Sequence, residues 1–271
     1  MAFSRLGFIV TPYSVHGDRD PKTGEIIPQG SANRLVMLET GYLEFLTVVD
    51  GTDTPVSRHL EDRMDKYIGV HLVAFTVADA EAEAQRIAEE GIDLQPTVNL
   101  RRSIEAEDGS DVEVAFSVVR ARFDLFPEGR VQTLTHHTPE HVWQDRYIAR
   151  DNGIAGLGDI IYASENPAES AARLAKFTGR SQVNSELGVS IQLDRGKLTF
   201  AKRQDLQETL GLEAPRHSPS IAAIGLVSRD VALTERYLET HGIGFDRMEN
   251  IGLLIKPSEA LGAALLIYKK Y

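Results

Sequence analysis

The stretch Val70-His71-Leu72-Val73-Ala74-Phe75-Thr76-Val77, followed by Ala78-Asp79-Ala80-Glu81, decides the fold of this chain. Its apolar, β-branched and aromatic residues predict a buried strand that carries one histidine. Alanines and Ile87 then recur at helical spacing, and Gly91 ends the run. Three further strands are expected at residues 94–104, 112–122 and 129–135. The unit therefore reads strand, helix and three strands.

This unit recurs in degenerate form along the chain, and internal repetition is a specific guide to architecture. Aligning Gly91 with Gly242 places Asp79 on Asp230 without a gap. A third unit has a strand at 157–162, a helix at 167–177 and strands at 189–193 and 197–202. The fourth has a strand at 221–227, a helix at 231–241 and strands at 245–249, 252–256 and 263–268.

A first unit is incomplete at its beginning. It shows a helix end at 2–6, Gly7 and strands at 8–11, 32–38 and 41–49. We expect it to lack its first strand, and we expect the sheet edge so left to be covered, since a bare edge invites aggregation. Residues 12–30 are predicted to be a long loop, 50–66 and 205–220 polar connectors, and 138–150 a linker helix that starts near Pro139.

The composition of the chain argues against several classes of partner and site. The chain has 271 residues, a net charge of -11 and no cysteine. An acidic chain without a basic cluster argues against a nucleic-acid partner. The absence of cysteine excludes disulfides and thiolate metal sites. The sequence has no apolar run that would span a membrane, and its start does not resemble a secretory signal, so we expect a cytoplasmic protein.

The order of these motifs resembles the vicinal oxygen chelate superfamily, which includes glyoxalase I, bleomycin-resistance proteins and extradiol dioxygenases. A closer similarity is to glyoxalase-like domain proteins, carried by Gly30-Ser31-Ala32-Asn33-Arg34 and Tyr42-Leu43-Glu44. The His-Thr-Pro-Glu segment 137–140, Trp143 and Asn152-Gly153 extend the similarity over nearly the whole chain.

The resemblance implies an α+β fold of tandem βαβββ modules, paired into two curved-sheet half-barrels. Residues 1–137 would form the first pair with the active site, 138–156 a linker helix, and 157–271 a second pair that serves as scaffold or dimer surface. A homodimer is possible, and neither nucleic acid nor membrane is expected as a partner.

Members of the superfamily hold a metal between paired modules. Carried over, the ligands would be His71, Glu44, Gln132 and His136, with Zn, Mn, Fe or Ni all allowed. Glu44 and His136 are the catalytic candidates, and Glu44 could act as a base next to a carbonyl. The candidates for substrate binding are His16, Asn33, Arg34 and His137.

Ordinary structural roles remain open for each residue. His71 could be a core histidine bonded to backbone, Glu44 could face solvent, and the pair His136-His137 could simply end a strand, although one of the two should face inward. The function implied is a metal-dependent lyase, isomerase or dioxygenase acting on a small oxygenated organic molecule. The alternative is a metal-free protein that sequesters a small molecule, as bleomycin-resistance proteins do.

Overall fold

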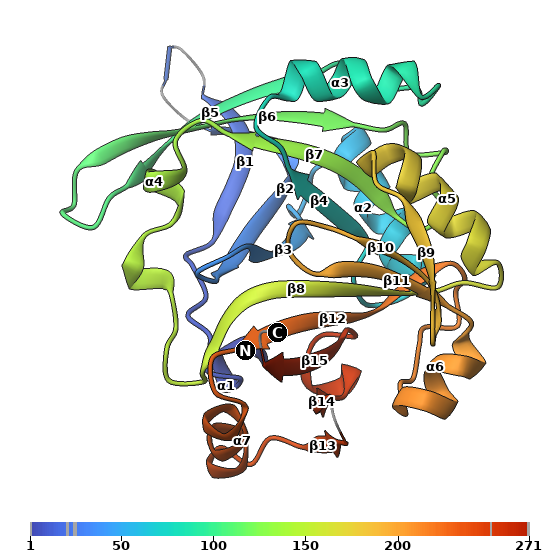
Figure 1. The fold of residues 1–271 in the computed structure, drawn as a ribbon. Helices are drawn as coiled ribbons and strands as arrows, with labels where there is room; N and C mark the ends of the chain where they lie inside the picture. Colours follow the sequence, from blue (N-terminus) through green and yellow to red (C-terminus); the bar gives the residue numbers. More distant parts are fainter. Residues whose placement is uncertain (1, 20–21, 24–25, 250, 270–271) are drawn as a thin grey trace.

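The computed structural model describes residues 2–19, 22–23, 26–249 and 251–269. In this part of the chain the strands form three sheets with the orders β1-β2-β3, β4-β7-β6-β5 and β13-β14-β15-β12-β8-β11-β10-β9. Helices cover their outer faces (Figure 1). The predicted α+β fold of tandem βαβββ modules is confirmed.

The second module follows the predicted order. It consists of β4 (Leu72–Thr76), α3 (Ala80–Glu89), β5 (Val98–Glu105), β6 (Asp111–Arg120) and β7 (Arg130–His136). Asp79 caps α3 by accepting hydrogen bonds from the backbone N–H groups of Glu81 and Ala82. Ile87 is fully buried beneath the helix. The capping residue and the apolar stripe together fix where this helix begins and which face it buries.

The third and fourth modules share one sheet. They comprise β8 (Ile154–Ala163), α5 (Pro167–Thr178), β9 (Gln182–Ser185), β10 (Gly188–Gln192), β11 (Lys197–Ala201), then β12 (Ser220–Ser228), α7 (Val231–Thr240), β13 (Phe245–Met248), β14 (Gly252–Ile255) and β15 (Ala264–Lys269). The antiparallel pairing of β8 with β12 joins them. The sequence did not predict β9, whose four residues are all exposed.

The first module contains α1 (Ala2–Arg5), β1 (Ser14–Arg19), β2 (Ile26–Met37) and β3 (Tyr42–Val48). The predicted loop over 12–30 is wrong, because β1 pairs with β2 across it; Asp20, Pro21, Gly24 and Glu25 lie outside the described residues. The predicted strand at 8–11 is reduced to one bridge between Val10 and Val36. The glycines and prolines of this segment predicted a loop. The two strands β1 and β2 form because they pair with each other.

The connectors also carry helices that the sequence analysis missed. They are α2 (Pro55–Lys66) and α6 (Arg203–Leu210). Thr54 and Ser57 form a capping box at the start of α2.

The predicted linker helix through Arg150 is wrong. Only α4 (Pro139–Val142) and a 3₁₀ turn (Asp145–Tyr147) are helical. The indole of Trp143 donates to the carbonyl of Leu38 and Gln144 donates to that of Glu105, so tertiary contacts interrupt the helix.

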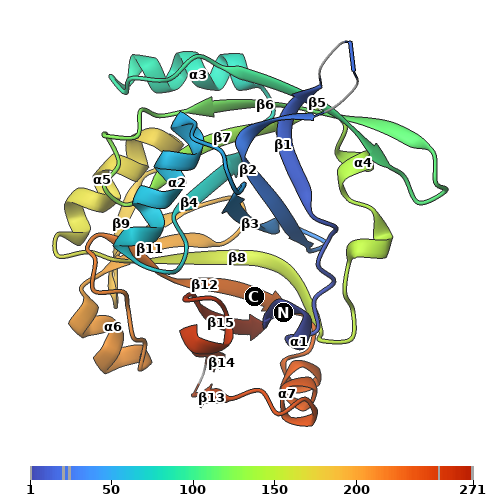
Figure 2. The ribbon, with the colours of Figure 1, turned by 180° about the vertical axis from the view of Figure 1, so that it is seen from behind.

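The three-stranded and four-stranded sheets face each other. Figures 1 and 2 show α3 on one side of the four-stranded sheet and β1, β2 and β3 on the other. A continuous apolar core runs through both halves of the chain, with members such as Val36, Ile87, Phe177 and Leu265. No helix in the described residues is long and apolar enough to cross a bilayer.

Candidate functional site

Strand alternation gathers polar side chains on the inner face of the four-stranded sheet. Arg120 of β6 lies opposite Gln132 of β7, and Phe116 lies opposite His136. Leu72 of β4 pairs with Arg130, the first residue of β7. Because residues two apart on a strand share a face, Arg130, Gln132 and His136 point the same way as Arg120. Arg102 of β5, which pairs with Val114, shares this face.

The three-stranded sheet presents Glu44 toward this surface. Glu44 is exposed to solvent, and its Oε1 accepts a hydrogen bond of 2.7 Å from Nδ2 of the buried Asn33. In the described part of the chain its Oε2 accepts none. His16 of β1 bonds through Nδ1 to Oγ of Ser31 at 2.9 Å. A fixed amide therefore orients the carboxylate while leaving one oxygen available.

Two contacts join the facing sheets. Arg102 Nη1 donates to Ser14 Oγ at 3.3 Å. The rings of Tyr42 and His136 have their centroids 6.1 Å apart in an edge-on arrangement. We call His16, Glu44, Arg102, Arg120 and Arg130 the arginine–glutamate cluster.

Burial is the largest influence on the pKa values of the arginines and His16 in this cluster. Burial lowers the pKa of Arg130 to about 10, the charge of Arg120 acts in the same direction, and Glu44 opposes both. Burial also lowers the pKa values of Arg102 and Arg120, again against the attraction of Glu44. The pKa of His16 is lowered, mainly by burial, so this imidazole is neutral at pH 7.

Aromatic rings surround His136. Its centroid lies 5.0 Å from that of Trp143 and 6.4 Å from that of Phe116. Burial lowers the pKa of His136. A pocket of about 280 Å³ adjoins this group, lined among others by Thr76, His136 and Trp143.

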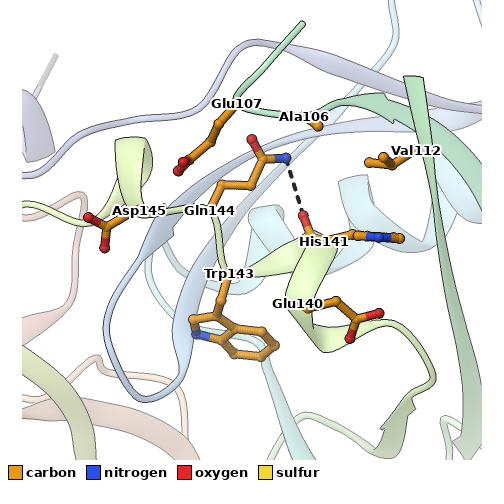
Figure 3. A pocket seen from close by; sticks show the side chains of 8 residues that line it. All are labelled: Ala106, Glu107, Val112, Glu140, His141, Trp143, Gln144 and Asp145. Carbon is orange, nitrogen blue, oxygen red and sulfur yellow. Dashed lines mark hydrogen bonds between the residues drawn. The ribbon is translucent and has the colours of Figure 1, made fainter. Parts of the chain in front are cut away.

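A second pocket, also about 280 Å³, is likewise lined by Trp143 (Figure 3). Glu107, Glu140 and Asp145 border it, and Gln144 Nε2 donates to the carbonyl of His141 there. Neither the arginines nor Glu44 line this pocket.

His71 is not placed with the other proposed metal ligands. Its Nε2 bonds to the carbonyl of Tyr67 at 2.8 Å, and the two rings lie 4.1 Å apart. It precedes β4 and shares the parity of Val73 and Phe75, which face away from Arg130 and Gln132. Gly129 crosses so close to it that an added Cβ would lie 2.8 Å from the His71 carbonyl. This is the ordinary role of a histidine bonded to backbone.

Two candidates for substrate binding also lie elsewhere. His137 points the opposite way from His136, and its Nε2 bonds to Ser117 Oγ at 2.8 Å. Arg34 Nη1 donates to the carbonyl of Thr11, and its guanidinium lies over the ring of Tyr13. Of the other candidates, Asn33 donates to Glu44, and His16 feels the charge of Glu44.

The described residues do not fit the implied divalent metal. Among them no three His, Asp, Glu or Cys side chains are grouped so that they could hold a metal ion. Glu44 and His136 remain on the facing surfaces, but His71 does not join them. The charge of Glu44 acts on three cationic guanidinium groups of the facing sheet, and these would repel a divalent cation.

The three arginines were not among the site residues predicted from the sequence. Arg120 continues the alternation of Val114, Phe116 and Val118, and Arg130 has the parity of Gln132. That parity was the signal which could have identified them, because it assigns them to the face of Gln132 rather than to solvent.

Comparisons with known proteins agree with the architecture. A family model described as a glyoxalase-like domain matches residues 1–178. No curated protein matches the sequence. Among solved structures, a hypothetical protein from Staphylococcus aureus has a TM-score of 0.60 at 11% identity and covers 89% of this chain and 86% of its own.

Two weaker structural similarities were also found. A xylose isomerase-like TIM barrel/4-hydroxyphenylpyruvate dioxygenase fusion protein has a TM-score of 0.49 at 14% identity, over 100% of this chain and 46% of that one. The Mn(II)-bound glyoxalase from Novosphingobium aromaticivorans has a TM-score of 0.47 at 9% identity, over 73% and 62%. The family match spans well over half of the chain, so this chain belongs to the glyoxalase-like domain family.

Proposed function

We propose that this chain is an enzyme of glyoxalase-like type that removes a proton next to a carbonyl in a small oxygenated organic molecule, with Glu44 as the base. The observation that carries the proposal is the solvent-exposed carboxylate of Glu44, held by Asn33 at 2.7 Å and facing three arginines. A base needs a fixed position, access to substrate and a free oxygen, and Glu44 has all three.

The surroundings of Glu44 suit the charge that such a step creates. Removing the proton leaves an enolate, whose oxygen becomes negative. Donors fixed before the reaction stabilise that charge without reorganising. The guanidinium groups of Arg102, Arg120 and Arg130 are such donors, and the step needs no divalent cation. This chemistry favours a lyase or isomerase over a dioxygenase among the reactions that the resemblance implies.

Neighbouring residues have supporting roles in this proposal. Asn33 orients the carboxylate. Neutral His136, with Tyr42 and Phe116, forms a wall against which the body of the substrate packs. The exposed face of Glu44 passes the abstracted proton to another substrate atom or to water.

A metal-free binding protein is the second candidate. The aromatic group around His136 favours it, because Tyr42, Phe116 and Trp143 could hold a flat ligand without any reaction.

Hydrogen–deuterium exchange separates the two. In D₂O, NMR would follow the loss of the proton next to the carbonyl in pyruvate, dihydroxyacetone phosphate and dihydroxyacetone. We expect the chain to accelerate exchange in at least one of them, also after dialysis against a chelator. Glu44→Gln should lower the rate by about 10²–10⁴-fold. The control Glu113→Gln should keep it, because this residue of β6 is exposed and paired with Arg101.

Exchange that survives Glu44→Gln would overturn the role of this residue. Binding without exchange of any of the three compounds would overturn the enzymatic proposal and support the binding protein. Exchange that chelator treatment abolishes and added metal restores would overturn the metal-free mechanism.

A further inference from the structure

We propose that Arg120 and Arg130, with Arg102 farther along the same surface, bind an oxyanion, a carboxylate or phosphate group, so that the molecule taken by this site is a small organic anion. The inference rests on the proposed function for the site itself and adds the chemical class of its substrate.

The three arginines come from neighbouring strands of one sheet. Arg120 lies opposite Gln132, and Arg130 is two residues before Gln132 on β7. The pairings β5–β6 and β6–β7 place Arg102 on the same surface but opposite Val114, six residues along β6 from Arg120, so Arg120 and Arg130 are the close pair. The guanidinium groups of such a close pair can approach a single anion from two sides.

Several buried polar atoms on this surface have no partner. The Nε atoms of Arg102, Arg120 and Arg130 are inaccessible to water and donate no hydrogen bond within the described residues. Gln132 is 9% exposed, and its Oε1 is equally unpartnered. A buried polar group without a partner is destabilising, and proteins retain few of them. A ligand that supplies the missing acceptors explains why these groups persist.

The positive charges on this surface indicate that its ligand is negatively charged. In the described part of the chain none of the three arginines forms an ion pair, although the chain has 40 acidic residues and a net charge of -11. Glu44 is the carboxylate that acts on all three, and His16 is neutral. Among the side chains that the structure describes, one negative charge against three positive charges leaves two uncompensated, and an anion of one or two charges would balance them.

This arrangement also orients the substrate. An oxyanion held by the arginines at one end places the adjacent carbon toward the carboxylate of Glu44. Repulsion keeps the oxyanion itself away from Glu44, so the molecule cannot bind in the reverse direction.

Isothermal titration calorimetry of the full chain tests the proposal with malonate, its uncharged counterpart malonamide, and inorganic phosphate. We expect malonate or phosphate to bind and malonamide not to bind. Arg120→Met and Arg130→Met should each weaken anion binding at least tenfold. The matched control is Arg101→Met, because Arg101 is adjacent to Arg102 on β5 but is exposed and paired with Glu113. It should bind like the unchanged protein.

Thermal unfolding without ligand guards against a purely structural explanation. Removing an unpaired, half-buried charge should leave the melting temperature of Arg120→Met and Arg130→Met unchanged or higher. A structural role predicts a lower melting temperature and unchanged binding by the folded fraction.

The outcomes also separate this inference from the proposed function. Equal binding of malonate and malonamide, or anion binding that both methionine variants retain, would overturn the inference. Arginine-dependent anion binding without any proton exchange supports the inference while the enzymatic proposal fails. If the proton of dihydroxyacetone exchanges as fast as those of the two charged compounds, the enzymatic proposal is supported and the preference for an anionic substrate is contradicted.

Discussion

The ion pair between Arg173 and Glu128 allows the most quantitative prediction about the fold. Glu128 follows β6 in the second module, and Arg173 lies on α5 in the third. The Glu128 side chain has 0% exposure, and Arg173 donates to it at 2.6, 3.1 and 3.3 Å. Both carboxylate oxygens depend on this one arginine within the described residues. The pair therefore ties the half of the chain that carries the candidate site to the other half.

Arg173→Met would leave a buried carboxylate without a counterion. Breaking a buried pair in this way costs about 3–5 kcal/mol. For a chain of this size that corresponds to a fall in melting temperature of roughly 6–15 °C. The double variant Arg173→Met with Glu128→Gln should recover much of the loss, because no buried charge remains.

Differential scanning calorimetry would measure these changes, with Arg180→Gln as the control. Arg180 pairs with Asp194 at 47% and 83% exposure, so its loss should cost about 0–1 kcal/mol. A melting temperature of Arg173→Met equal to that of the control would refute the reasoning, since it would mean that Glu128 is solvated or paired elsewhere.

Two further perturbations probe the core and the response to acid. Phe177 is fully buried between Phe75 and Phe126. Phe177→Ala should therefore lower the free energy of unfolding, measured in urea titrations, by about 3–5 kcal/mol. A loss below about 1 kcal/mol would contradict its central place in the core. Burial, with the charges of Arg63 and Arg130, lowers the pKa of half-buried His59 to about 4, below its unfolded value of about 6.5. Both states are neutral above pH 6.5, but between pH 6.5 and 4 only the unfolded state takes up the proton, so stability should fall across this window. Urea titrations at pH 7 and pH 5 would give the free energy of unfolding at each pH, and its loss between them should be smaller in His59→Gln. An equal loss in the two proteins would contradict the pKa shift.

The sequence predicted most of the second, third and fourth modules, because there the strand and helix periods are clear. Asp79 and Asp230, which the sequence alignment paired, both cap helices. The first module was harder to read. Strand β1 forms only through its pairing with β2, and α2 has few apolar residues to reveal a stripe, so local patterns gave little signal.

The candidate site was predicted in part. The family resemblance and the alternation of side chains along strands predicted Glu44, Gln132 and His136 as site residues. In the structure these three lie on facing surfaces. Their roles as metal ligands stay untested. His71 differs from these residues by one residue of strand parity, which turns its side chain to the other face of the sheet. The arginines were overlooked because an arginine on a strand ordinarily faces solvent; only the pairing of three strands shows that these share a surface.

The central claim is that two facing sheets form one anion-binding site around Glu44. A crystal structure of the chain grown with malonate tests it most directly. The account predicts a malonate carboxylate within hydrogen-bonding distance of the guanidinium groups of Arg120 and Arg130, with the carbon next to it directed toward Glu44. Malonate bound only at the outer surface, with these arginines paired to carboxylates of the chain itself, would contradict the account.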